Sequence, residues 1–264
     1  MPAAERQDDL TLLRDAAREA GKIARRYWRR SPENWDKAGG AGPVSEADLA
    51  VNRMLARELG ASRPGYGWLS EESDDSSDRL AARRVFVIDP IDGTRAFLAG
   101  EETFAHSLAV VEDGRPVAGV VYLPVPDLMF CACEGGAATL NGEVLRATEA
   151  RELAGADILT TRASLDPLLW PGGVPDIRRS FRASLAYRMC LVAQGRFDGM
   201  VTLRDAWEWD IAAGALIAAM AGAAVSDRHG DALRFNAARP QAPGVLTAPP
   251  ALHAAFLSRL RPVG

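Results

Sequence analysis

VFVIDPIDGT, residues 85–94, joins a run of apolar residues to a short turn that carries two carboxylates. The β-branched and aromatic run Val85–Ile88 predicts a buried strand, which we expect to end at Asp89 because a proline follows. Asp89 and Asp92 flank this proline-stiffened turn, so both side chains and the Ile91 carbonyl can converge on one point. Hard oxygen ligands of this kind suit Mg²⁺ or Mn²⁺, whereas zinc prefers histidine or cysteine.

Two further acidic segments lie where we expect an ordered element to meet a loop. Glu71-Glu72 follows an apolar stretch, and Trp209-Asp210 stands at the predicted start of a helix. Taken singly, each segment also has an ordinary structural interpretation. Asp210 could cap its helix, Glu71-Glu72 could be a solvated loop, and Asp92-Gly93 could be a common turn pair. The residues alone leave both interpretations open.

Upstream of these segments the sequence predicts two helices. Apolar residues recur at spacings of three and four from Leu13 to Tyr27, as in an amphipathic helix. The glycine-rich stretch from Asp36 to Val44 is expected to be a loop, and it contains Lys37, one of two lysines in the chain. The pattern of a capping box at residues 45–48 then predicts a second helix that extends to Leu59.

Downstream the sequence predicts a loop and then a sheet built of hairpins. Ser73–Arg79, rich in serine and aspartate, is expected to be a surface loop of limited order. Three strands are predicted at Phe104–Val111, Pro116–Leu123 and Leu128–Cys133, the first two joined by a hairpin turn. Helices followed by hairpins define an α+β arrangement up to residue 141.

Beyond residue 141 helices and strands alternate. Strands are predicted at residues 158–160 and 197–202, and helices at residues 184–194 and 211–221. This alternation favours an α/β arrangement. We therefore expect two packed subdomains, residues 1–141 with most of the metal ligands and residues 142–264 completing the site, with the site in the crevice between them.

Composition excludes several classes of function. The 264 residues carry a formal net charge of −4, 48% hydrophobic and 25% charged residues, and no long run of like charge. Nucleic-acid binding and a stable membrane association are therefore not expected. Because the first ten residues lack the basic-then-apolar order of a secretory signal, we expect a cytoplasmic protein.

Cysteine and histidine do not form a recognisable site. Cys131, Cys133 and Cys190 lack the spacing of a zinc site or a disulfide framework. Cys131 and Cys133 alternate in an apolar run and are expected to be buried on one face of a strand. The three scattered histidines are assigned structural or surface roles.

Four segments in order resemble the motifs of one enzyme family. DPIDGT at residues 89–94 resembles the DP[IL]DGT signature of the inositol monophosphatase-like, metal-dependent and lithium-sensitive phosphatases, and WDIAAG at residues 209–214 resembles their WDxAAG signature. Glu71-Glu72 and the segment 44–48 stand in the corresponding places. The resemblance covers roughly residues 10–230 and implies a layered αβαβα sandwich with the metal site between its two sheets.

The resemblance also implies a ligand set and a reaction. Glu71, Asp89 and the Ile91 carbonyl would hold a first Mg²⁺, and Asp89, Asp92 and Asp210 a second, with two or three ions per site and Mn²⁺ as a substitute. These ions would activate the water that attacks the phosphate ester, and no covalent enzyme intermediate would be needed.

Further roles follow for the groups around these ligands. Thr94 would pair with Asp48 to orient and deprotonate the water, with Glu71 also contributing to catalysis. The backbone amides of Gly93 and Thr94 would bind phosphate, and Asp92 and Asp210 would contact substrate. Asp48 keeps its alternative role as a helix cap, and Lys37 is either a solvated lysine or part of a loop that closes over the site.

The identity of the phosphate ester depends on the basic residues. Arg95 follows the signature, and Arg182, Arg188 and Arg204 come from the segment that supplies substrate contacts in the family. Arg95 and Arg204 therefore favour a substrate with a second phosphate, although 29 of the 31 basic residues are arginine.

The predicted function is that of a 3'(2'),5'-bisphosphate nucleotidase, which converts 3'-phosphoadenosine 5'-phosphate to AMP and phosphate. Inositol-1-monophosphatase is the alternative, followed by histidinol-phosphatase, and a non-catalytic binding or regulatory family member is the alternative from another class. The partner is then a small-molecule phosphate ester. A homodimer is also possible, although no segment of the sequence identifies an interface.

Overall fold

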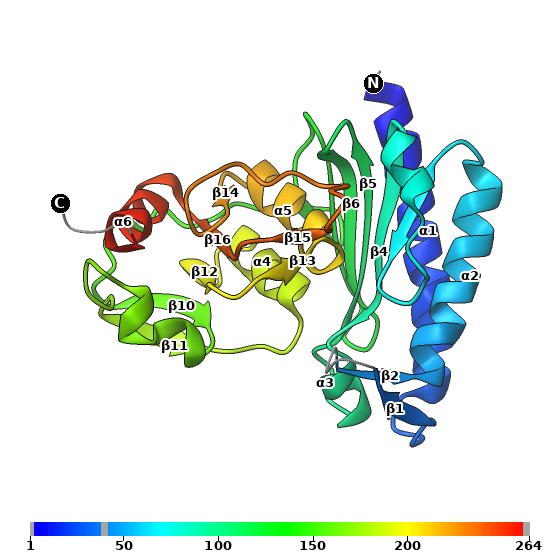
Figure 1. The fold of residues 1–264 in the computed structure, drawn as a ribbon, viewed down its shortest axis with the longest axis horizontal. Coiled ribbons are helices and arrows are strands. Elements are labelled where there is room, and N and C mark those ends of the chain that lie inside the picture. The colour runs from blue at the N-terminus through cyan, green and yellow to red at the C-terminus, as the bar shows by residue number, and fades with distance from the viewer. Residues whose placement is uncertain (1–2, 38–41, 261–264) are drawn as a thin grey trace.

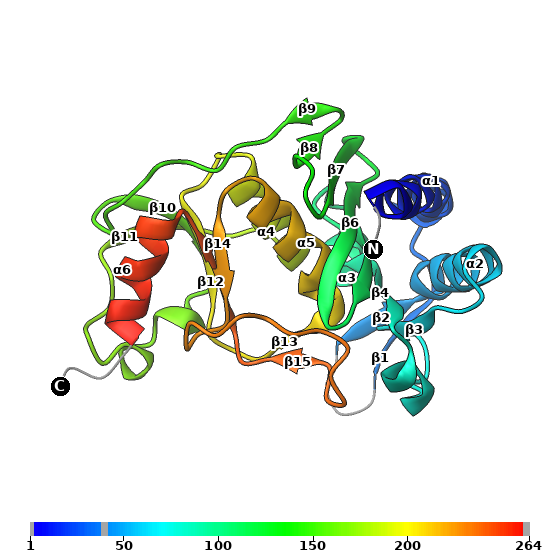
Figure 2. The same ribbon diagram turned by 90° about the horizontal axis from the view of Figure 1, so that it is seen from above.

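The computed structural model describes residues 3–37 and 42–260 and shows five layers of helix and sheet. In Figure 1 these layers follow one another from right to left as a helix pair, a large sheet, a second helix pair, a smaller sheet and a final helix. Figure 2 shows the same succession from above. The αβαβα sandwich predicted from the sequence is confirmed.

The larger sheet has seven strands in the order β3-β4-β5-β6-β7-β8-β9. Its strands are β3 (Gly67–Ser70), β4 (Arg84–Asp92), β5 (Ala105–Glu112), β6 (Arg115–Leu123), β7 (Leu128–Cys133), β8 (Thr139–Leu140) and β9 (Glu143–Val144). All neighbouring strands are antiparallel except the β3-β4 pair. The helices α1 (Ala3–Tyr27) and α2 (Glu46–Ser62) cover its outer face, as the apolar periodicity predicted.

The smaller sheet is mixed and has the order β11-β10-β12-β16-β14. Its strands are β10 (Ala156–Thr160), β11 (Ile177–Ser180), β12 (Gly199–Thr202), β14 (Ala224–Ser226) and β16 (Val245–Ala248), with α6 (Pro250–Leu260) on its outer face. Short elements complete the chain: the pair β1 (Asn34–Asp36) and β2 (Pro43–Ser45), the pair β13 (Ala206–Trp207) and β15 (Gln241–Ala242), α3 (Thr94–Leu98), and the 3₁₀ turns η2 (Ser77–Ala81), η3 (Ala163–Leu165) and η4 (Pro167–Leu169).

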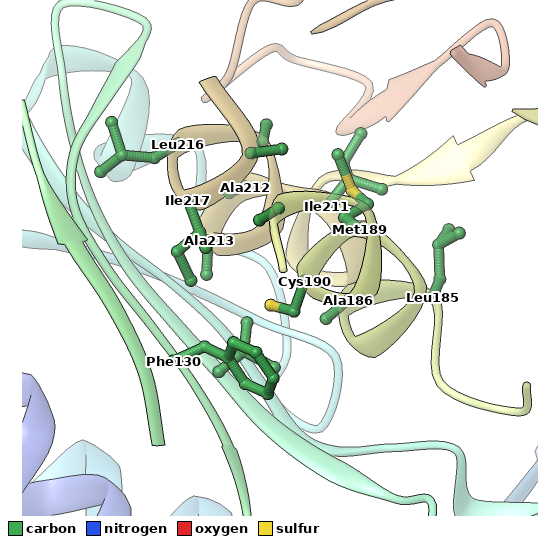
Figure 3. Packing of buried hydrophobic residues seen from close by; sticks show 14 of the residues in the cluster. Phe130, Leu185, Ala186, Met189, Cys190, Ile211, Ala212, Ala213, Leu216 and Ile217 are labelled. Atoms are coloured by element: carbon green, nitrogen blue, oxygen red, sulfur yellow. The ribbon is translucent and has the colours of Figure 1, made fainter. Parts of the chain in front are cut away.

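The two central helices, α4 (Leu185–Ala193) and α5 (Glu208–Met220), are apolar on nearly every side because a sheet lies on each face of this layer. Figure 3 shows Cys190 of α4 beside Phe130 of the larger sheet, and Met189 of α4 and Ala213 of α5 belong to the same cluster of buried residues. Close packing depends on Gly119 of β6, since a Cβ atom there would lie 3.1 Å from the Cα atom of Ala213. Both helices of this central layer begin beside the C-terminal end of β4.

Strand β4 differs from the expected strand in its length. It continues from Arg84 to Asp92, through the proline that was predicted to end it. The pairing with β5 shifts its register between Asp89 and Asp92, as in a β-bulge. A bulge tolerates proline because the extra residues leave the hydrogen-bond ladder. The irregular pairing places both aspartates at one end of a buried strand.

Three smaller predictions need correction. The segment Ser73–Arg79 begins as an exposed loop, as predicted, but its limited order is wrong, because the segment continues into η2 and Arg79 is only 3% exposed. The Arg79 guanidinium binds Asp75 and the Oδ1 atom of Asn236, which ties the segment to the C-terminal half. Cys133 is partly exposed while Cys131 is buried, so the two cysteines do not share one environment. Helix α5 begins at Glu208, before the predicted residue 211.

The division of the chain into two subdomains at residue 141 stays a prediction. Strands β8 and β9 continue the larger sheet beyond this residue, to Val144. In the described ranges, no helix combines the length and the apolar character that crossing a membrane requires.

Candidate functional site

A cavity of about 550 Å³ lies where the end of β4 meets the first turns of α3, α4 and α5. Of the residues predicted for the site, all except Asp48 line this cavity. They are Glu71, Asp89, Ile91, Asp92, Gly93, Thr94, Arg95, Arg204 and Asp210. Residues more than 100 positions apart in the chain therefore share one hollow, between the two halves that the sequence distinguishes.

Three carboxylates form the centre of the cavity. Asp89, Asp92 and Asp210 each offer an oxygen, and these three atoms lie within 4.8 Å of one another. One Asp89 oxygen also accepts a hydrogen bond of 2.9 Å from the backbone N–H of Ile91, which fixes its orientation. Asp89 and Asp92 are 1% and 7% exposed, so water gives their charges little screening.

The first turn of α4 holds Asp92. The Ser184 hydroxyl donates to this carboxylate at 2.7 Å, and the backbone N–H groups of Leu185 and Ala186 donate at 3.2 and 2.7 Å. Ser184 also caps the helix, since its hydroxyl accepts from the N–H of Tyr187. A helix start satisfies its free N–H groups in this way with a negative charge. Ser184 had a sequence signal as a helix cap, but nothing in the sequence indicated its contact with Asp92.

Asp210 lies in the first turn of α5, where the helix is anchored from two sides. The alternative role of Asp210 as the N-cap is wrong, because the cap is Trp207 and Asp210 is the third helical residue. The Ser107 hydroxyl of β5 donates to the carbonyl of Trp209 at 2.9 Å. The buried Glu208 carboxylate accepts from the backbone N–H groups of residues 236 and 237. These contacts hold Asp210 against β4.

The carboxylates destabilise one another when no cation lies between them. Burial, followed by the neighbouring negative charges, raises the pKa of Asp89 and Asp210 well above the ordinary value. Burial also raises the pKa of Asp92, although Ser184 and the α4 amides oppose that rise. Three carboxylate oxygens this close, two from buried aspartates and one from the half-buried Asp210, suit a hard divalent cation, and the donor set contains no histidine or cysteine.

Asp48 lies behind the cavity wall and uses its two oxygens differently. Oδ2 accepts from the backbone N–H and the hydroxyl of Ser45, at 2.9 and 2.5 Å, which completes a capping box at the start of α2. Oδ1 lies 3.1 Å from the Thr94 hydroxyl, which also lies 3.1 Å from the Ile91 carbonyl oxygen. Burial raises the pKa of Asp48 to about 6. The capping contact and the predicted contact with Thr94 therefore coexist.

Glu71 lines the cavity but stands apart from the three clustered oxygens. Its carboxylate receives the Lys37 ammonium at 2.7 Å, and the same ammonium contacts Glu72 at 2.6 Å. Lys37 is therefore an ion-pair partner at the edge of the site and not a freely solvated lysine. Residues 38–41 of the loop predicted around it lie outside the described residues.

Arginines also line the cavity, and their positive charge is opposite in sign to that of the aspartates. Arg95 and Arg204 have exposed side chains, whereas Arg188 is only 4% exposed. Arg182 does not line the cavity and lies over the ring of Phe197. Sequence reasoning missed several further lining residues, among them Thr161, Phe181 and Trp207, because their place depends on how the two sheets pack.

A carboxylate cluster and several arginines that line one cavity are the arrangement of a metal-dependent phosphoric monoester hydrolase, because the carboxylates suit cations and the arginines suit anions. The sequence profile of the Inositol monophosphatase family matches residues 5–263, and the chain belongs to this family. The protein is accordingly a phosphoric monoester hydrolase.

Its relatives carry more than one substrate in their names. The chain is 36% identical over 232 residues to an inositol-1-monophosphatase of Rhizobium meliloti, covering 84% of this chain and 86% of the relative. It is 30% identical to the 3'(2'),5'-bisphosphate nucleotidase CysQ of Salmonella typhimurium, covering 83% and 91%. The solved structure of the Thermotoga maritima IMPase superposes with a TM-score of 0.83 and 29% identity, covering 96% of each chain.

Proposed function

We propose that this enzyme hydrolyses a phosphate monoester of a 3'(2'),5'-bisphosphate nucleotide, releasing inorganic phosphate and a nucleoside monophosphate. The observation that carries this proposal is a cavity that aspartates and arginines line together. Its aspartates suit a divalent cation bound to the reacting phosphate, and its arginines suit a second negative group on the same substrate. A neutral polyol would leave the arginines without such a partner.

Magnesium fits the carboxylate side of the cavity. Asp89, Asp92 and Asp210 would hold it through the oxygens that lie within 4.8 Å of one another. Glu71 and the Ile91 carbonyl, which line the same cavity, would serve a further ion, and the proposed content is two or three ions. When bound, divalent magnesium lowers the pKa of water and offsets the charge of the phosphate oxygens.

Thr94 and Asp48 then act on the attacking water. The Thr94 hydroxyl can accept a hydrogen bond from the water and pass its own proton to Oδ1 of Asp48, 3.1 Å away. A water oxygen forms a bond to phosphorus as the ester P–O bond breaks, and the leaving oxygen takes a proton from solvent. The backbone N–H groups of Gly93 and Thr94, at the turn where Gly93 adopts a φ of 98°, are proposed to bind the phosphate oxygens.

Phosphate release from a defined set of esters tests this function. The set comprises 3'-phosphoadenosine 5'-phosphate, inositol-1-phosphate, histidinol phosphate and fructose-1,6-bisphosphate, each with Mg²⁺ and with excess chelator. We expect the highest kcat/KM for 3'-phosphoadenosine 5'-phosphate and no turnover in chelator. Full activity in chelator would contradict the role of the carboxylate cluster.

Inositol-1-phosphate is the second candidate substrate, because a relative with 36% identity carries the name inositol-1-monophosphatase. A higher kcat/KM for inositol-1-phosphate would establish this alternative. Absence of phosphate release from every ester, in a folded protein that binds Mg²⁺, would instead favour a binding or regulatory role. The presence of Glu71, Asp89 and Asp210 in the cavity supports the catalytic role.

A further inference from the structure

Arg188 places a buried positive charge in the wall of the cavity. It belongs to the first turn of α4, the same turn that holds Asp92, and its side chain is among those lining the cavity. Only 4% of the residue is exposed, whereas Arg95 and Arg204 are exposed. A charge that is removed from water to this extent requires compensation from groups around it.

The contacts of Arg188 leave part of this requirement unmet. One terminal nitrogen donates to the Ala183 carbonyl at 3.2 Å, and the guanidinium carbon lies 4.8 Å from the centre of the Phe181 ring. The Nε atom has no hydrogen-bond partner in the described chain, and Arg188 forms no ion pair with a described carboxylate. Buried polar groups in native proteins nearly always have a partner, and Arg188 is a lining residue of the cavity, so its incompletely satisfied guanidinium points to a ligand there.

The charges near Arg188 indicate that the ligand is an anion. Asp92 and Asp210 lie near enough to favour the charged guanidinium, and Arg204 lies near enough to disfavour it. When magnesium neutralises the aspartates, two arginines remain close together with no counter-charge. A planar guanidinium with a free N–H edge binds two oxygens of a phosphate or carboxylate at once, which an ammonium group cannot do.

We infer that Arg188 is a specificity-determining residue that binds a second anionic group of the substrate, the phosphate that is not cleaved. The inference rests on the proposed function and assigns the buried Arg188, in place of the exposed Arg95 and Arg204, as the main determinant. Phe181 positions the guanidinium by covering one of its faces. Because Phe181 is 47% exposed, its ring can be changed without opening the core.

The test compares two substrates that differ only in the second phosphate. We expect Arg188→Gln to lower kcat/KM for 3'-phosphoadenosine 5'-phosphate at least tenfold more than for 3'-AMP, mainly through KM. Arg188→Lys should recover part of the difference, and Phe181→Ala should lose about threefold selectively. Arg182→Ala is the matched control, since Arg182 lies on the same segment outside the cavity lining. This variant should not change kcat/KM for 3'-phosphoadenosine 5'-phosphate relative to kcat/KM for 3'-AMP.

Two further measurements separate this inference from its alternatives. With Mg²⁺ present, wild-type protein should bind 5'-AMP more tightly than adenosine, and Arg188→Gln should weaken that preference. If wild type fails to hydrolyse the bisphosphate but shows the Arg188-dependent preference, the proposed function is wrong and the inference stands. Equal losses on both substrates, with a changed Mg²⁺ affinity, would show that Arg188 only balances Asp92 and Asp210. A wild type without preference for 5'-AMP would also overturn the inference.

Discussion

Two sets of side chains in the cavity lining are held in different ways. We call them the carboxylate wall, which consists of Asp89, Asp92 and Asp210, and the arginine wall, which consists of Arg95, Arg188 and Arg204. On the carboxylate wall, Asp89 and Asp92 belong to β4, a strand paired on both sides in the larger sheet, and one backbone N–H donates to Asp89 and two donate to Asp92. On the arginine wall, Arg95 and Arg204 are exposed, and the guanidinium of Arg188 packs over the half-exposed ring of Phe181. Backbone N–H groups and Ser184 hold the carboxylates, whereas Arg95 and Arg204 are exposed and Arg188 has one hydrogen bond, to the Ala183 carbonyl, and its contact with Phe181.

This difference separates chemistry from selection of the substrate. Ligands for a divalent cation tolerate little displacement, and strand pairing and two helix starts set the positions of the proposed ligands. Contacts with the remainder of a substrate can change with single side chains without disturbing the strands. We therefore expect substitutions on the carboxylate wall to abolish turnover and substitutions on the arginine wall to change its selectivity.

The largest effect is expected at Asp210. The substitution Asp210→Asn removes one charged oxygen from the cluster within 4.8 Å, and it should lower kcat by about a thousandfold or more and weaken Mg²⁺ binding. Since Asp210 is not the N-cap of α5, the fold should be retained. Isothermal titration with Mg²⁺ and circular dichroism check both statements. An Asn variant that binds Mg²⁺ as tightly as wild type would show that Asp210 is not a ligand.

The next effect concerns the pair of Thr94 and Asp48. Thr94→Ala should lower kcat by about a hundredfold, the usual scale for a lost proton-transfer partner, with little change in Mg²⁺ affinity. Asp48→Asn should do the same and also cost about 1 kcal/mol of stability through the weakened capping box. The double variant should be little worse than the more damaged single variant. Additive losses in this cycle would mean that the two residues act independently.

The carboxylate wall should also make stability depend on pH and metal together. Without metal, burial raises the pKa of each of the three clustered aspartates, Asp89, Asp92 and Asp210. Burial also raises the pKa of Asp48 to about 6 and that of Glu72 to about 7. The folded state therefore binds more protons than the unfolded state between about pH 4 and 7, so its stability falls as the pH rises through this window. Melting curves in chelator should show Tm decreasing from pH 5 to 8, and Mg²⁺ should reduce the decrease. A Tm that rises over this pH range in chelator would show that the pKa values of these carboxyl groups are not raised in the folded protein.

The smallest effects are expected at the exposed arginines. Arg95→Ala and Arg204→Ala should each lower kcat/KM by about fivefold at most, because exposed ion pairs are worth roughly 1 kcal/mol or less. The loss should be greater for a bisphosphate than for a monophosphate. Steady-state kinetics at low and high salt would test this, since screening should shrink the effect. A loss at Arg204 as large as that at Arg188 would remove the distinction between exposed and buried arginines.

Much of the carboxylate wall could be predicted from the sequence. The run before Asp89 defines a buried strand, and the spacing of Asp89 and Asp92 around a proline indicates two ligands at its end. The capping pattern at residues 45–48 is present as predicted. These features depend on neighbours in the chain, so local chemistry is enough to infer them.

Only the tertiary structure decided how distant residues meet. The contact of Ser184 with Asp92 spans 92 positions, and the burial of Arg188 results from the packing of α4 between two sheets. The same holds for Arg79 and Asn236, which are 157 positions apart. The sequence determined the strand, the turn and the types of ligand, because these follow from periodicity and backbone preference. Packing decided which charges are buried and which partners they find, because burial depends on the whole assembled core.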